Sequence, residues 1–473
     1  MRSGQHRLRL LAGLAGTALW GGVPAHAGTG SDLALPESWN APSPPPTSAS
    51  ANDGGRWWQV FGDTQLATLI EQADRTNSSL AIAAARLDAA RASARLSAGA
   101  ARPQIKFGLS ASHAEGPLIN DAGGSGSLFV GSGQLAWELD LSGRLGEARK
   151  AARFDAEAAA ALLRDTRLEV QTSVAYSYFK VQFLLAELEL ADRRAVLLDE
   201  QLAIISKRTE HGLSARLELA ALASQVAQLR QTQGDLRLAL AEARNALAFL
   251  CGAASPAELS PSLPLAFPTI PAGLPAQVLA RRPDVEAAYA MLSAADHRYT
   301  AARRAWLPNL ALTAAGGSAS SSLSTLLSAA SRQFGLGMLL ELPLFDGGRH
   351  KAETGIRKAQ ADEALAHYKE VVLRALREVN DALEATQAAT SRLDQGAIVM
   401  AARSDAEATA VDRRRLGAIS VLAEIEARKA ANEAARNRLR QQFAGIDATL
   451  RLIRSLGGGW SAQAQCQPET PCS

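Results

Sequence analysis

The chain has 473 residues, of which 47% are hydrophobic, 21% are charged and only 5% are aromatic, and Ala, Leu, Arg and Glu dominate many windows, as in long helices. Its formal net charge of +3 comes from Arg2, Arg7 and Arg9, because the remaining Lys and Arg residues number 47, equal to the 47 Asp and Glu residues. This balance gives no electrostatic argument for nucleic-acid binding, and three cysteines argue against a disulfide scaffold or a zinc site.

Residues 1–27 are expected to form a secretory signal peptide. They combine a basic start ("MRSGQHRLR"), an apolar stretch and the small-residue sequence "AHA". Residues 28–55 are rich in Pro and Ser and are predicted to be a disordered arm. No later apolar run approaches the roughly 18–20 residues of a spanning helix. After export, the chain is therefore either soluble in the periplasm or crosses a membrane as a β-barrel.

The segment 56–252 is predicted to form a helix, a β-hairpin, a long helix and a return helix. Asp63–Arg102 contains no proline and has apolar residues at helical spacing. Strict alternation then predicts a hairpin over 103–141. Its apolar face is expected to include Ile105, Phe107, Leu109, Ala111, Phe129, Leu135, Trp137, Leu139 and Leu141.

A stretch of about 65 residues without glycine or proline follows, between Gly146 and Gly212. At 1.5 Å per residue it predicts a helix roughly 100 Å long, far beyond the globular norm. A return helix to about Leu250 and a Pro-rich linker over 253–275 complete this part of the chain.

The same order then restarts over 276–460, with a helix, a hairpin over 308–345, a long helix to Gly417 and a return helix, followed by a tail over 461–473. Pro103 and Pro308, Arg144 and Arg349, and Gly212 and Gly417 are each separated by 205 positions. This spacing indicates an internal duplication.

Four strands cannot close a barrel, and open strand edges in lipid would leave backbone groups unpaired at a cost of several kcal/mol each. The strands therefore either close with those of other copies of the chain or lie outside lipid. Three copies would give twelve strands, whereas two would give eight with almost no lumen, which favours a trimer. The alternative is a soluble antiparallel coiled-coil protein with two small hairpins.

Several stretches closely resemble the TolC-type outer-membrane efflux factors, particularly the NodT subgroup. They are "WWQVFGDTQLATLIEQA", "WELDLSGRLGEARKAA", "VQTSVAYSYF", "RRPDVEAAYAMLSAADHRYTAARRAWLPNL", "LELPLFDGG" and "LGGGW". The resemblance implies a mainly α fold with two repeats, in which a homotrimeric, 12-stranded transmembrane β-barrel continues into a long periplasmic α-helical barrel.

The resemblance further implies a passive duct of a tripartite efflux system in the outer membrane of a Gram-negative bacterium. Its partners would be a periplasmic membrane-fusion adaptor, an inner-membrane pump of the resistance-nodulation-division class and outer-membrane lipid. Many NodT-like members carry a lipobox cysteine at the cleavage site, but here the first cysteine is Cys251, so an unlipidated N-terminus is expected. The alternatives are the duct of a type I secretion system and a soluble periplasmic scaffold.

In the family, the turns between the long and return helices form the periplasmic tips. The candidate adaptor contacts are Arg208, Gly212, Leu213, Arg415, Gly417 and Ala418. Gly212 and Gly417 are expected to adopt the left-handed conformation that a tight turn between helices requires. Arg208 and Arg415 are candidates for ion pairs that hold a closed state, although exposed pairs are worth under roughly 1 kcal/mol each.

Family members place acidic side chains just inside the tip as a cation-selective ring. The matching residues are Glu218 and Glu426, with Glu424 as a competitor. Glu424 and Glu426 lie roughly 200° apart around a helix, so both cannot face the lumen. Solvated helix surface is the plain alternative for all three.

Nothing in the sequence predicts catalysis or a cofactor: GxSxG, HExxH, Walker and CxxC motifs are missing. Trp137 and Trp306, near strand ends, are predicted either for an interfacial aromatic belt or, for Trp137, for the strand–helix junction. The cargo stays open, because the few methionines and histidines provide no ladder of soft-metal ligands.

Overall fold

The computed structural model describes residues 56–115, 125–255 and 275–458, together with Pro36, residues 38–39 and a few positions between 258 and 270. The predicted signal peptide, most of the arm, much of the linker, and Trp460, Cys466 and Cys472 lie outside the described residues. The chain divides into two compact units, one of residues 1–82, 163–285 and 371–473, the other of residues 83–162 and 286–370. Each unit contains pieces of both sequence repeats.

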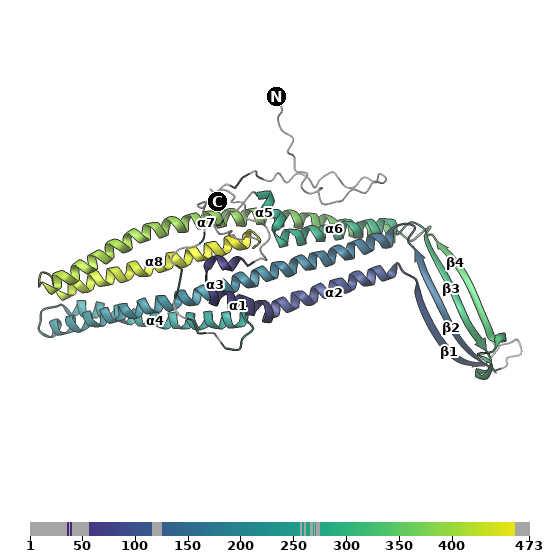
Figure 1. The fold of residues 1–473 in the computed structure, drawn as a ribbon, viewed down its shortest axis with the longest axis horizontal. Helices are drawn as coiled ribbons and strands as arrows, with labels where there is room; N and C mark the ends of the chain where they lie inside the picture. The colour runs from purple at the N-terminus through teal and green to yellow at the C-terminus, as the bar shows by residue number, and fades with distance from the viewer. Residues whose placement is uncertain are drawn as a thin grey trace, which may run out of the picture. The chain divides into compact units, whose positions relative to one another are not determined.

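The first unit is helical (Figure 1). It holds η1 (Trp57–Phe61), α1 (Thr64–Thr76), α4 (Arg216–Leu250), α5 (Pro275–Arg281), α8 (Val421–Ser455) and the C-terminal parts of α3 (Arg144–Glu210) and α7 (Arg349–Arg415). Its largest apolar cluster takes side chains from both repeats, including Trp57, Leu66, Ile70, Tyr178, Phe179, Ile446 and Ile453. The apolar residues whose spacing predicted the first helix thus form the buried face of α1.

The first predicted helix is in fact two helices, because Asn77 interrupts it in an extended conformation between α1 and α2 (Ser78–Ala100). The Asn77 carboxamide oxygen accepts from the amides of Ser79 and Leu80, and its nitrogen donates to the Leu250 carbonyl at 2.8 Å. The prediction of an unbroken helix over Asp63–Arg102 was wrong. Asn77 caps the N-terminus of α2 and also donates a hydrogen bond to a carbonyl at the C-terminus of α4 that has no partner within its own helix.

The second repeat has the same break, 205 positions later. Arg282 separates α5 from α6 (Pro283–Arg304) and donates to the Ser455 carbonyl at the end of α8, at 2.9 Å. Its guanidinium also pairs with Asp284 and Glu378, each at 2.7 Å. We call each of these breaks, together with the helix end that it contacts, a joint. The joint is built from a neutral amide in the first repeat and from an ion-pair network around the buried Arg282 in the second.

The second unit contains a four-stranded antiparallel sheet in the order β1-β2-β3-β4 (Figure 1). The strands are β1 (Gln104–Glu115), β2 (Ser125–Leu139), β3 (Asn309–Ser320) and β4 (Arg332–Glu341), with the short turns η2 (Leu323–Thr325) and η3 (Ala329–Ser331) before β4. Most of α2 and α6 and the N-terminal parts of α3 and α7 belong to this unit as well. Both predicted hairpins are present, and pairing of β2 with β3 joins the two repeats in one sheet.

The strand register gives the sheet two unlike faces. One, called the apolar face below, carries Ile105, Phe107, Leu109, Leu135, Trp137, Leu310, Leu312, Phe334, Leu336, Met338 and Leu340. The other carries mainly small or polar residues, among them Lys106, Ser110, Ser132, Gln134, Thr313, Ala315, Gln333 and Gly335. The apolar face is not covered by the chain itself, since Phe107 is 79% and Phe334 is 91% exposed.

The predicted strand extends too far at one end. β2 ends at Leu139, and Leu141 lies in the turn before α3, so it does not belong to the apolar face. The turn forms because the Asp140 carboxylate accepts from the amides of Leu145 and Gly146, at 3.0 and 2.6 Å, and so caps the start of α3. Trp137 lies at this junction, where its indole nitrogen donates to the Ala101 carbonyl at 3.1 Å.

The elements of the two repeats correspond closely. α3 and α7 have 67 residues each, and α4 and α8 have 35 each, at the same 205-residue spacing. This agreement confirms the predicted duplication. Among the helices that the structure describes, none is both long enough and apolar enough to cross a membrane.

Candidate functional site

The candidate site is the pair of turns between α3 and α4 and between α7 and α8. Gly212 and Gly417 have φ of 73° and 75°, which confirms the predicted left-handed conformation. After each glycine, an amide reaches back five residues: Leu213 donates to the Arg208 carbonyl at 2.7 Å, and Ala418 donates to that of Arg413 at 2.8 Å. Both turns are therefore Schellman motifs, in which only glycine fits without strain.

Large apolar side chains are exposed around both turns. Leu213 is 68% and Leu416 is 78% exposed, and Leu217 in the first turn of α4 is exposed too. Leu213 is among the predicted adaptor contacts, whereas Leu217 and Leu416 are not, although both lie within five residues of a tip glycine. Exposed leucines on a narrow turn provide an apolar surface for a partner.

The two arginines of the prediction make only local contacts. The Arg208 guanidinium donates to the Leu213 carbonyl at 3.4 Å. Arg415 pairs with Asp412 of its own helix at 3.8 Å, and both side chains are largely exposed. Neither arginine makes an ion pair with another helix among the described residues, so within one chain they do not hold the hairpins together.

The three glutamates differ in environment. Glu218 is exposed in the first turn of α4. Glu426 is 58% exposed at its side chain, pairs with Lys429 at 3.0 Å and accepts from the Gln201 amide at 3.0 Å. The Glu424 side chain is only 17% exposed and lies 3.8 Å from Arg428. Glu424 is thus mostly covered and Glu426 mostly exposed, as expected for two residues on different sides of the helix.

α3 contacts its two neighbours in different ways. Against α4 it forms an apolar cluster of Ala191, Leu198, Ile205, Leu222, Val226 and Leu229. Against α8 the contacts include the stacked rings of Phe183 and Phe443 and also polar pairs. Glu187, which is 2% exposed, accepts from Arg436 and Arg440 at 2.6 and 2.8 Å, and Arg194 pairs with Glu433. No local sequence pattern predicts these polar pairs, because more than 230 positions separate the partners.

The described residues contain no cluster of His, Cys, Asp and Glu side chains that could hold a metal ion. Cys251 is a buried free thiol whose pKa is raised by burial. At the turns, the described side chains provide exposed charged and apolar surface.

A family model described as "Outer membrane efflux protein" matches the chain twice, over residues 69–253 and 274–458. The two matched segments coincide with the two repeats.

Relatives similar over most of their length include a pyoverdine export outer membrane protein, OpmQ of Pseudomonas putida. It is 31% identical over 450 residues, covering 91% of this chain and 93% of its own. The cation efflux system protein CusC of Escherichia coli O6:H1 is 29% identical over 407 residues, covering 85% and 88%. Among solved structures, the outer membrane protein VceC of Vibrio cholerae has a TM-score of 0.76 at 25% identity, covering 87% of this chain and all of that one.

Proposed function

The chain belongs to the outer membrane efflux protein family, and from this membership we infer that it is the outer-membrane channel of a tripartite efflux system. The fold is TolC-like, in agreement with the resemblance found in the sequence. In this role the protein provides a duct, and the work of transport is done by a pump in the inner membrane.

We propose that three copies close their sheets into one twelve-stranded barrel. The observation that carries this proposal is the sheet itself: β1 and β4 have no strand paired with their outer edges among the described residues, and the apolar face is exposed. A sheet with open edges is not stable in lipid, whereas closure pairs every strand. The apolar face would then contact lipid, and the small or polar face would line the lumen.

The tips are proposed to dock a periplasmic adaptor through Leu213, Ala418 and the glycine turns. Helices of 67 residues, about 100 Å at 1.5 Å per residue, exceed what a roughly 30 Å bilayer requires. This excess supports a bridging role toward the inner membrane. An inner-membrane pump of the resistance-nodulation-division class is the proposed third component.

Glu218 and Glu426 are proposed to form an acidic ring at the aperture, since both are exposed near the tips. The test is single-channel conductance of the mature protein, purified from outer membranes, in planar bilayers. Glu218→Ala/Glu426→Ala should lose cation selectivity or conduct more. Glu424→Ala is the matched control, since that side chain is largely covered and lies beside Arg428, and it should behave as wild type.

Unchanged selectivity together with unchanged conductance in the double variant would refute the ring while leaving the duct in place. If no channel formed and the protein ran as a soluble monomer in sucrose gradients, the duct itself would be refuted.

A further inference from the structure

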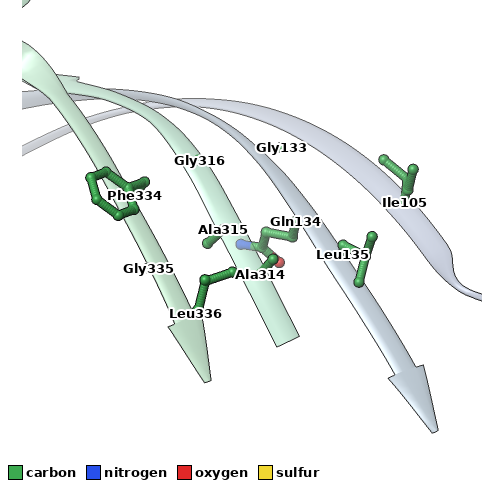
Figure 2. Close-up of a pocket in the computed structure, with 10 residues that line it drawn as sticks. All are labelled: Ile105, Gly133, Gln134, Leu135, Ala314, Ala315, Gly316, Phe334, Gly335 and Leu336. Atoms are coloured by element: carbon green, nitrogen blue, oxygen red, sulfur yellow. The ribbon is translucent and has the colours of Figure 1, made fainter. Parts of the chain in front are cut away.

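The apolar face of the sheet has a hollow at its centre. The hollow has a volume of about 410 Å³ and is lined by Ile105, Gly133, Gln134, Leu135, Ala314, Ala315, Gly316, Phe334, Gly335 and Leu336. Figure 2 shows Phe334 and Leu336 on β4 to one side of the two glycines Gly133 and Gly316, and Ile105 on β1 to the other. It is a shallow hollow, open to the surface and lined mainly by apolar atoms.

The strand register explains the hollow. Phe107, Gly133, Gly316 and Phe334 form one row across the four strands, with aromatic residues on the outer strands and glycines on the inner ones. A Cβ atom added at Gly316 would meet no atom within 4 Å. The next row on the apolar face is Ile105–Leu135–Ala314–Leu336. Seven of the ten lining residues belong to these two rows, and the other three, Gln134, Ala315 and Gly335, belong to the strand positions between them. The hollow therefore opens on the apolar face.

Arg332 lies two residues before Phe334 on β4, on the same face. It is exposed, and its guanidinium makes no hydrogen bond or ion pair with any residue that the structure describes, while its backbone pairs with Ser318 of β3. From Phe334 to Leu340 the face stays apolar for about 20 Å along the strand, comparable with the roughly 25 Å apolar band of outer-membrane barrels. Arg332 therefore stands at the edge of this band, where a lipid headgroup would lie.

We propose that the hollow and Arg332 together bind one phosphate-bearing lipid, with an acyl chain in the hollow and a phosphate on the guanidinium. The proposal rests on the inferred function, in which the apolar face contacts the outer membrane. β4 runs from Arg332 toward α7, so if the helices are periplasmic, Arg332 is at the outer leaflet. The lipid is then the bisphosphorylated, multiply acylated lipid A of that leaflet, and arginine suits phosphate because it donates two parallel hydrogen bonds.

The test is native mass spectrometry of the purified mature protein in detergent, titrated with synthetic bisphosphorylated lipid A. Gly316→Leu should occupy the hollow, since a Cβ atom there meets no neighbour, and Arg332→Gln should remove the phosphate contact. Arg332→Gln is expected to weaken lipid A binding about tenfold through the loss of one charge-assisted contact, and Gly316→Leu is expected to weaken it about tenfold by excluding the acyl chain from the hollow. Ala111→Leu, which enlarges an exposed residue of the apolar face outside the hollow, should bind as wild type.

Three results would overturn the proposal: equal binding by all four proteins, equal binding of phosphatidylcholine, or displacement of lipid A by millimolar inorganic phosphate. The last would identify a free-phosphate site. Conductance of each variant in planar bilayers separates the two levels of inference. Channels with unaltered lipid binding would refute the lipid site alone, whereas the absence of channels in every protein would refute the inferred function.

Discussion

Replacing Arg282 with methionine tests how the second repeat holds its helical joint. The Arg282 side chain is 7% exposed and pairs with Asp284 and Glu378, while donating to the Ser455 carbonyl. Arg282→Met keeps much of the apolar volume but removes the guanidinium from two carboxylates and a helix-end carbonyl, and of the two carboxylates Asp284 keeps a hydrogen bond from the Val285 amide. Breaking a buried ion pair from one side costs about 3–5 kcal/mol.

The lower end of that range, about 3 kcal/mol, is expected. The Glu378 side chain is 39% exposed, so water compensates part of its loss, whereas that of Asp284 is 22% exposed. A local cost of about 3 kcal/mol corresponds to about a hundredfold faster amide exchange through local opening. Hydrogen exchange measured by mass spectrometry on the purified mature protein should show this increase in α5, the start of α6 and the end of α8.

Arg281→Met is the matched control, because Arg281 is the adjacent arginine and is exposed. It should leave exchange within about twofold of wild type, as surface changes usually do. The triple change Arg282→Met/Asp284→Asn/Glu378→Gln should recover much of the loss, since it removes the uncompensated charges. If the triple variant exchanged as fast as Arg282→Met alone, the cost would lie in packing, and the electrostatic reasoning would be wrong.

The remaining predictions concern pH and the two tips. Acid should loosen the Arg282 joint in the wild type but not in Arg282→Met, as hydrogen exchange followed down from pH 7 would reveal. Burial raises the pKa of the Asp284 carboxyl, but the hydrogen bonds and charge of Arg282 outweigh burial and hold the pKa below 3.8. The ionised Asp284 therefore stabilises the folded joint above that pH, and this contribution is lost as the carboxylate is protonated below it. Asp165→Asn should raise the melting temperature at pH 7, because burial and the charge of Asp284 raise the pKa of Asp165, so its ionised form opposes folding; a lower melting temperature would contradict this. Gly212→Ala and Gly417→Ala should each destabilise their turn by about 1–2 kcal/mol, visible as faster local exchange, whereas Ala at the interior helical Gly355, which has open space around it, should not.

Long helices and their turns could be predicted from the sequence because glycine and proline mark where they begin and end. The break at Asn77 could not be predicted in the same way, since it depends on the Leu250 carbonyl, more than 170 positions away, and periodicity along the chain carries no information about such a contact. The break at Arg282 does have a local signal, which the prediction missed: Pro283 disfavours a helical conformation of the residue before it and suits the first position of a new helix.

Alternation predicted the strands and their faces, and the register bears this out, since Ile105 and Leu135 lie opposite each other on the apolar face. It could not predict the pairing of β2 with β3, which joins segments from different repeats. In the candidate site, helical spacing separated Glu424 from Glu426, but the partner of Glu426 on α3, Gln201, was invisible for the same reason. A local sequence pattern therefore predicts whether a segment is a helix or a strand and which residues share a face. Contacts between residues distant in sequence become visible only in the folded structure.

The two joints indicate which features of the duplication are constrained. In each repeat a glycine of positive φ follows the return helix, Gly252 and Gly457, and a Cβ atom there would lie 2.8 Å from the Thr76 carbonyl oxygen or 3.1 Å from that of Arg281. The backbones therefore approach equally closely in both repeats, while the side chain that satisfies the helix end differs. Among the described residues, the Asn77 side chain forms hydrogen bonds only with the end of α4 and the start of α2, whereas Arg282 also reaches Glu378 on α7. Both repeats thus keep the close backbone contact. The guanidinium of Arg282, at the position that corresponds to Asn77, adds an ion pair with α7, one of the two longest helices that the structure describes.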